Sequence, residues 1–142
     1  MILLDTNVIS EPLKPAPEPA VLTWLDQQNI ETLFLATISL AELRFGVSAL
    51  PEGRKKDGLK AALDARIIAL FGPRILVFDM AAAEAYAVIR ARAKTAGKAI
   101  GAADGYIAAI AAAHGFAVAT RDTAPFEAAG VPVVDPWTHG GF

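Results

Sequence analysis

Four carboxylates far apart in the chain are the residues whose types and spacing could do chemistry: Asp5, Glu42, Asp104 and Asp122. Asp5 and Asp122 each follow a short apolar run of the kind that forms a strand, and ligands bind beyond the carboxyl ends of parallel strands. Asp104 is the only charged residue from position 99 to position 113. A charge buried there would cost several kcal/mol unless it were paired or bound to a metal.

If the four acids converge, their mutual repulsion needs a cation. Two carboxylates about 5 Å apart repel by about 3 kcal/mol at an effective dielectric near 20. Mg²⁺ or Mn²⁺ prefers oxygen ligands, keeps several waters and accepts substrate phosphates. Such an ion can acidify a water and stabilise the leaving oxygen of a phosphoryl displacement, so the expected chemistry is phosphodiester hydrolysis.

Each acid also has a structural alternative at the start of a helix. Asp5 could cap the helix that follows it, and Asp122 could cap the turn that precedes Gly130. Ser39 and Glu42 have the spacing of a capping box. Asp104 could be a first-turn acid favoured by the helix dipole, by about 0.3 to 1 kcal/mol. Asp79 also follows an apolar run, although it more simply starts the next helix.

The elements that must position these acids alternate between strand and helix, which predicts a parallel sheet flanked by helices. Expected strands are 2–4, 33–36, 75–78, 117–120 and 131–134. Expected helices are 20–28, 40–50, 59–71, 81–96 and 102–113, the last two ended by Gly97 and Gly115. The segments 51–57 and 136–142 are expected to be an exposed loop or helix start and a loose tail.

Composition limits the kinds of metal site and the cellular compartment that fit this chain. The chain has 142 residues, which suits a single domain spanning residues 1–142. It has no cysteine and only two histidines, so thiolate and typical zinc sites are excluded and oxygen must hold any metal. The net charge of −2 excludes a global positive field for nucleic acid. We find no leader and no apolar stretch long enough for a bilayer, and we expect a cytoplasmic protein with no membrane contact.

Five short motifs, in order and at suitable spacing, give the chain a resemblance to PIN-domain ribonuclease toxins of the VapC and FitB type. They are residues 3–7 (LLDTN), 39–46 (SLAELRFG), 102–108 (AADGYIA), 119–122 (ATRD) and 135–137 (DPW). The resemblance implies a three-layer α/β/α PIN-like domain with a central parallel sheet. It also implies that the four acids bind Mg²⁺ or Mn²⁺, that the Thr120 hydroxyl helps to arrange the site, and that Asn7 supports it.

The same resemblance implies an activity and partners. The activity is that of a metal-dependent endoribonuclease, the toxin of a type II toxin–antitoxin system, acting on an RNA substrate. The partners are a cognate antitoxin protein and a second copy of the chain in a homodimer, with promoter DNA bound only through the antitoxin. Many relatives have asparagine where this chain has Asp122, and asparagine again where it has Asp135, so Asp122 makes this site more acidic.

Two alternatives come from other classes. A catalytically silent PIN-like module could use the acids only to bind an antitoxin, and metal dependence separates it from a nuclease. A haloacid dehalogenase domain would need a second aspartate two residues after Asp5, which this chain lacks. A receiver domain would need a paired acid near the first strand and a lysine after the last one, and no lysine follows residues 131–135.

The basic and aromatic side chains do not by themselves define where an RNA strand would lie. Arg90, Lys94 and Lys98 recur every fourth residue and could line a phosphate path or form a solvated helix face. Arg44 and Arg121 could each pair with a site carboxylate. The aromatic residues Trp24, Tyr86 and Tyr106 could stack on bases or pack in the core.

Overall fold

Five short parallel strands form the centre of the molecule in the computed structural model, which describes residues 1–139. The sheet order is β3-β2-β1-β4-β5, and each neighbouring pair is parallel. The strands are β1 (Ile2–Leu4), β2 (Leu33–Ala36), β3 (Ile75–Leu76), β4 (Ala117–Ala119) and β5 (Val133–Val134). All five were expected, and the last three are one or two residues shorter than the sequence pattern predicts.

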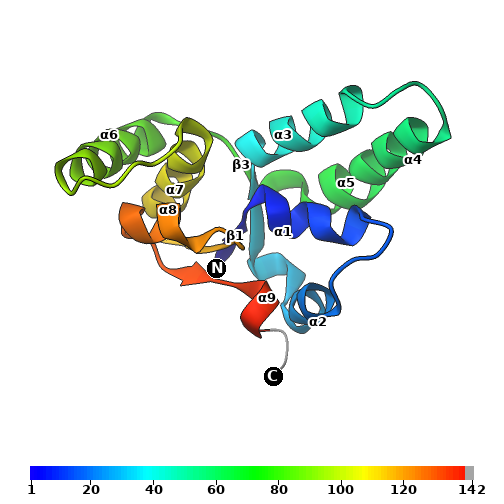
Figure 1. The fold of residues 1–142 in the computed structure, drawn as a ribbon, viewed down its shortest axis with the longest axis horizontal. Helices are drawn as coiled ribbons and strands as arrows, with labels where there is room; N and C mark the ends of the chain where they lie inside the picture. The colour runs from blue at the N-terminus through cyan, green and yellow to red at the C-terminus, as the bar shows by residue number, and fades with distance from the viewer. Residues whose placement is uncertain (140–142) are drawn as a thin grey trace.

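Helices cover both faces of this sheet (Figure 1). On one face lie α6 (Met80–Thr95), α7 (Ala102–His114) and α8 (Thr123–Ala129). The other face is covered by α1 (Thr6–Ser10), α2 (Pro19–Gln27), α3 (Thr37–Ser48), α4 (Arg54–Ala62), α5 (Ala69–Phe71) and α9 (Pro136–His139). The 3-10 turns are Glu11–Leu13, Ile30–Thr32 and Gly72–Arg74, and a π-helical segment, Leu63–Ile68, joins α4 to α5.

Alternation along β1 explains the two cores. Leu3 and Leu4 are both fully buried but point to opposite faces of the sheet, as successive strand residues must. Leu3 packs with Ile107 of α7 and Phe126 of α8. Leu4 belongs to the other core, together with Trp24 of α2. The three-layer α/β/α architecture is therefore confirmed, and Trp24 is a core residue.

Several helix boundaries differ from the sequence-based expectation. The expected helix 59–71 begins five residues earlier, at Arg54, and includes the π-helical segment. Residues 136–139 form the short helix α9 packed near α2, whereas a loose tail was expected; residues 140–142 lie outside the described part. Gly97 and Gly115 both have φ of +71° and end α6 and α7 as predicted. Within residues 1–139, every helix is too short or too polar to cross a membrane.

Candidate acidic site

Asp5 lies directly after the central strand β1 and is almost completely buried. One carboxylate oxygen accepts the Thr6 backbone N–H at 2.8 Å, so Asp5 caps α1 as the structural alternative predicts. The other oxygen accepts the Thr120 hydroxyl at 2.8 Å. Capping therefore uses only part of this carboxylate, and the strand end fixes its position at the carboxyl edge of the sheet.

Thr120 joins the ends of β1 and β4. Its side chain is fully buried, and its hydroxyl oxygen also accepts the backbone N–H of Asp122 at 3.0 Å. The Asn7 side-chain amide lies 3.5 Å from the same hydroxyl, and its carbonyl oxygen accepts the Arg121 backbone N–H at 3.3 Å. Thr120 and Asn7 thus hold the turn that presents Asp122 beside Asp5.

Glu42 comes from α3 and is exposed, and the prediction that it forms a capping box with Ser39 is wrong. The helix begins at Thr37, directly after β2, so Ser39 is already inside its first turn. Ser39 is fully buried, and its hydroxyl has no hydrogen-bond partner among the described residues. The Glu42 carboxylate instead accepts the Thr6 hydroxyl at 3.1 Å.

Asp104 and Asp122 complete the set from α7 and from the start of α8. Asp104 is half-buried in the first turn of α7, rather than fully buried, and accepts no hydrogen bond within residues 1–139. Asp122 occupies the N-cap position of α8 but makes no side-chain capping bond, so the cap expected for it is not formed. Both carboxylates therefore remain available for another partner.

All four predicted acids line one open hollow of about 310 Å³ at the carboxyl edge of the sheet. Thr6, Asn7 and Ser10 of α1 line it as well. Four separate elements, from positions 5 to 122, thus meet at one point of the surface. Thr120 lies underneath, as the buried hydroxyl that bonds to Asp5.

The electrostatics of this hollow oppose negative charge. Burial raises the pKa of Asp5, which the nearby charges of Glu42 and Asp122 raise further, against the lowering effect of its two hydrogen bonds. Desolvation also raises the pKa of Asp104, followed by the charges of Asp5 and Asp122. Like charges therefore act on one another across the hollow, as the convergence of the acids predicts.

A divalent cation suits the donor set, although no metal site is already assembled. Within residues 1–139, no three histidine, cysteine, aspartate or glutamate side chains are gathered closely enough to hold an ion. The donors are all oxygens, as Mg²⁺ and Mn²⁺ prefer, and burial, followed by the charges of neighbouring acids, raises the pKa of Asp5 and of Asp104, a cost to the ionised carboxylates that a cation would relieve.

The other candidates lie outside the hollow. Asp79 caps α6 by accepting the Ala82 backbone N–H at 3.0 Å, which is the simpler of its two interpretations. Arg44 pairs with Asp64 at 3.6 Å, not with a site acid. Arg121 lies over the Trp137 ring, 5.1 Å from its centroid. Neither arginine forms an ion pair with a site carboxylate in the described chain.

Sequence reasoning missed the contributions of Thr6 and Ser10. Thr6 stood out only as one residue of the LLDTN motif, yet its hydroxyl donates to Glu42 from 36 residues away. The available signal was helical geometry, because α1 starts at the strand end and its first residues must face the same edge as Asp5. Ser10 follows Asn7 on the same face, three residues on.

Comparisons with known proteins agree with this architecture. A family model described as PIN domain matches residues 2–131. The VapC ribonuclease Y4jK of Sinorhizobium fredii is 55% identical over 137 residues, covering 96% of this chain and 98% of that protein. Toxin FitB of Neisseria gonorrhoeae is 56% identical over 137 residues, covering 96% and 99%.

Solved structures give the same result. The chain superposes on the crystal structure of FitAcB from Neisseria gonorrhoeae with a TM-score of 0.94 and 55% identity, covering 96% of this chain and 99% of that one. The structure of FitAB bound to an IR36 DNA fragment also gives a TM-score of 0.94, at 54% identity over 96% of each chain. This chain belongs to the PIN-domain family, among the ribonuclease toxins of the VapC and FitB type.

Proposed function

We propose that this chain is a Mg²⁺- or Mn²⁺-dependent endoribonuclease, the toxin of a type II toxin–antitoxin system. The observation that carries the proposal is the convergence of Asp5, Glu42, Asp104 and Asp122 on one open hollow. The relatives named VapC ribonuclease and Toxin FitB support the choice of RNA and of a toxin. Evolution has little reason to keep four like charges together for stability alone.

The four acids have distinct parts in this proposal. Asp5 and Asp104 are the inner ligands, because they are the two most desolvated acids of the hollow and each is raised in pKa by its neighbours. Asp122 and Glu42 are more exposed and complete the ligand set directly or through water. Thr120 is a positioning residue that fixes the Asp5 carboxylate and the Asp122 backbone.

A bound divalent ion would supply positive charge for an attacking water and for the phosphoryl oxygens. This chain's own carboxylates would hold and orient that charge. Because Asp5 is held by two hydrogen bonds, its carboxylate is fixed before substrate arrives. The open side of the hollow leaves room for a phosphodiester to approach.

The test is cleavage of a labelled single-stranded RNA by the purified chain, with and without Mg²⁺ or Mn²⁺. Asp104→Asn should lower the cleavage rate by more than about 100-fold. Asp57→Asn is a matched control, because Asp57 is also a first-turn acid but lies on α4 outside the hollow. If wild type bound the metal and antitoxin but never cut RNA, a silent binding module would replace the nuclease.

The proposed function also implies protein partners. Complexes named FitAcB, FitAB and VapBC support an antitoxin for this chain, and two of these complexes were solved with DNA. Because this chain is acidic overall, we infer that it reaches promoter DNA only through the antitoxin. We also propose a homodimer in the cytoplasm. Light scattering of the free chain and of the co-expressed pair measures both assemblies, and a monomer in both would contradict the homodimer.

A further inference from the structure

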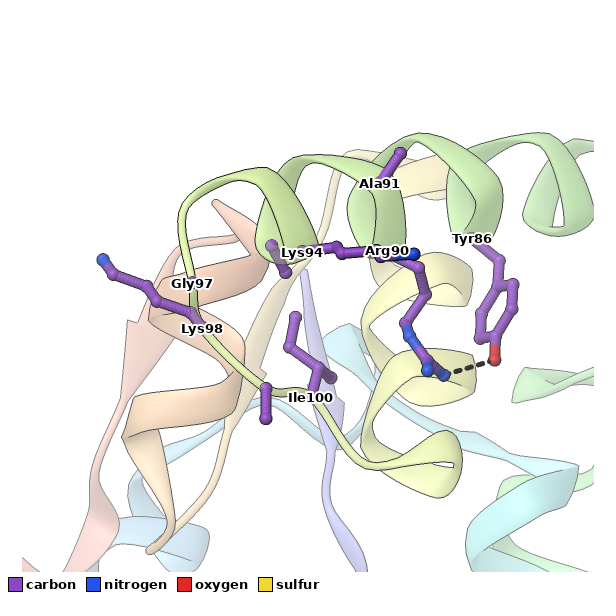
Figure 2. Close-up of a pocket in the computed structure, with 9 residues that line it drawn as sticks. Tyr86, Arg90, Ala91, Lys94, Gly97, Lys98 and Ile100 are labelled. Atoms are coloured by element: carbon purple, nitrogen blue, oxygen red, sulfur yellow. Dashed lines mark hydrogen bonds between the residues drawn. The ribbon is translucent and has the colours of Figure 1, made fainter.

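A second hollow, of about 590 Å³, lies between the end of α6 and the connection to α7, and it is basic. Arg90 and Lys94 line it from α6, and Lys98 lines it from the connection (Figure 2). Tyr86 and Ile100 form part of its wall, and no acidic side chain lines it. Its chemistry is therefore opposite to that of the acidic hollow.

These three cations are not neutralised by acids of the chain. Within residues 1–139, the ion pairs formed by basic residues are Lys14 with Glu11, Arg44 with Asp64 and Lys56 with Glu52. Arg90, Lys94 and Lys98 belong to none of these pairs, and all three are exposed. They give an otherwise acidic molecule a local positive surface that can receive an anion.

Arg90 is held in place before any ligand binds. It donates a hydrogen bond to the Tyr86 hydroxyl at 2.7 Å, drawn as a dashed line in Figure 2, and its guanidinium lies 5.4 Å from the centroid of that ring. Tyr86 is itself stacked on Tyr106, with centroids 4.9 Å apart. The planar guanidinium keeps most of its N–H donors for a further acceptor, and a fixed fork suits a phosphate.

Backbone geometry fixes Lys98. The Lys98 N–H donates to the Ala93 carbonyl at 2.8 Å, and the Gly97 N–H donates to the Lys94 carbonyl at 3.1 Å. With Gly97 at φ +71°, this is the Schellman arrangement that closes a helix. Arg90 and Lys94 lie one turn apart on α6, about 6 Å along its axis, and this turn places Lys98 next.

The basic hollow is connected to the acidic site through shared lining residues. Lys98 also lines a hollow of about 420 Å³ over α8, whose lining includes the acids Asp122 and Glu127. Asp122 in turn lines the acidic hollow beside Asp5 and Asp104. The three hollows therefore adjoin one another, first at Lys98 and then at Asp122, between Arg90 and the four acids.

We propose that Arg90, Lys94 and Lys98 bind successive phosphates of a single RNA strand on one side of the bond to be cut. The inference rests on the proposed function and specifies where that substrate lies. The acidic hollow repels a polyanion, so binding energy must come from phosphates distant from it. The strand leaves the site past Asp122 and follows the end of α6.

The test compares Lys94→Gln/Lys98→Gln with a control, Lys55→Gln/Lys60→Gln, which removes the same charge from α4. Arg90 is left intact so that Tyr86 keeps its partner. Binding of a short oligoribonucleotide is measured by fluorescence anisotropy in EDTA over a range of salt, and cleavage is measured separately with metal. The substrates are that oligoribonucleotide and a dinucleotide that has only the scissile phosphate.

Losing two phosphate contacts should weaken oligoribonucleotide binding roughly 10-fold at physiological salt and reduce the slope of log K against log salt by about 1.4. KM for the oligoribonucleotide should rise by a similar factor at unchanged kcat, whereas the dinucleotide and the control variant should show no change. Equal behaviour of both variants would overturn the path while leaving the nuclease intact. If the Lys94→Gln/Lys98→Gln variant lost binding of a polyglutamate peptide but bound RNA normally, the basic hollow would be assigned to an acidic protein segment instead. A wild type that does not cleave RNA would contradict the proposed function itself.

Discussion

Replacing Asp104 by asparagine removes one charge from the acidic hollow without removing a hydrogen bond, because Asp104 accepts none within residues 1–139. The charges of Asp5 and Asp122 act on it. Two unit charges about 6 Å apart repel by about 3 kcal/mol at an effective dielectric of 20. Since Asp104 is only half-buried, water screens this repulsion and reduces it to about 1.5 kcal/mol.

The helix dipole works in the opposite direction. A first-turn acid is stabilised by about 0.5 kcal/mol, which the asparagine loses. The net expectation is that Asp104→Asn, without metal at pH 7, unfolds with a free energy about 1 kcal/mol higher than wild type. For a chain of this size, that corresponds to a melting temperature higher by about 3 °C. Thermal unfolding in EDTA, followed by circular dichroism, measures it.

Asp57→Asn is the matched control for this measurement. Asp57 is the first-turn acid of α4, and it lines a hollow outside the acidic site together with Glu52, Lys56 and Lys60. The asparagine loses the dipole contribution and any attraction to these lysines, so the variant should become slightly less stable. If Asp104→Asn were destabilised as Asp57→Asn is, the argument that like charges oppose one another in the hollow would fail.

The pH dependence tests the raised pKa of Asp104, whose largest cause is burial, followed by the charges of Asp5 and Asp122. The pKa of Asp104 is raised in the folded protein, so between the ordinary and the raised value the folded state binds more protons than the unfolded chain. Wild type should therefore gain stability as pH falls through that window, and its difference from Asp104→Asn should shrink. Mn²⁺ at neutral pH should raise the melting temperature of wild type more than that of the variant.

Further predictions concern packing and positioning. Thr120→Val removes the hydroxyl that donates to Asp5 and should cost about 1 to 2 kcal/mol in unfolding free energy while slowing RNA cleavage; normal cleavage would show that Thr120 has no positioning role. Gly46→Ala on α3 should stabilise the protein by about 0.5 to 1 kcal/mol, because a Cβ there meets nothing within 4 Å. Gly105→Ala on α7 should show little or none of this gain, because its Cβ would lie 3.0 Å from the Tyr86 ring; equal gains in urea denaturation would contradict the close packing.

The sequence predicted which acids meet at the edge of the sheet better than it predicted the helix boundaries. Apolar runs followed by an acid identified Asp5 and Asp122, since a strand ending at the sheet edge leaves the next side chain there. Asp104 stood out because its neighbours are apolar. The length of the α4 to α5 segment was underestimated, because the basic start of α4 buries no residue and lacks hydrophobic periodicity.

Local sequence patterns do not predict hydrogen bonds between side chains that are far apart in the chain. The bonds from Thr6 to Glu42 and from Thr120 to Asp5 join residues 36 and 115 positions apart, and neither has a sequence signature. The cation–π contact of Arg121 with Trp137 is of the same kind. Such contacts depend on which strands become neighbours, and strand order is a property of the whole fold.

Glu42 shows how a wrong local prediction bears on the site. A capping box would have directed its carboxylate to the backbone of its own helix, and stability alone would have explained its presence. Because α3 starts at Thr37, directly after β2, the helix has no use for Glu42 as a cap. Asp122 likewise makes no side-chain cap. Two of the four acids therefore cap no helix, yet both line the same hollow as Asp5, whose pKa is raised mainly by burial and further by these two charges. A cost to stability without a structural gain is what a metal-binding site predicts and what a set of helix caps does not.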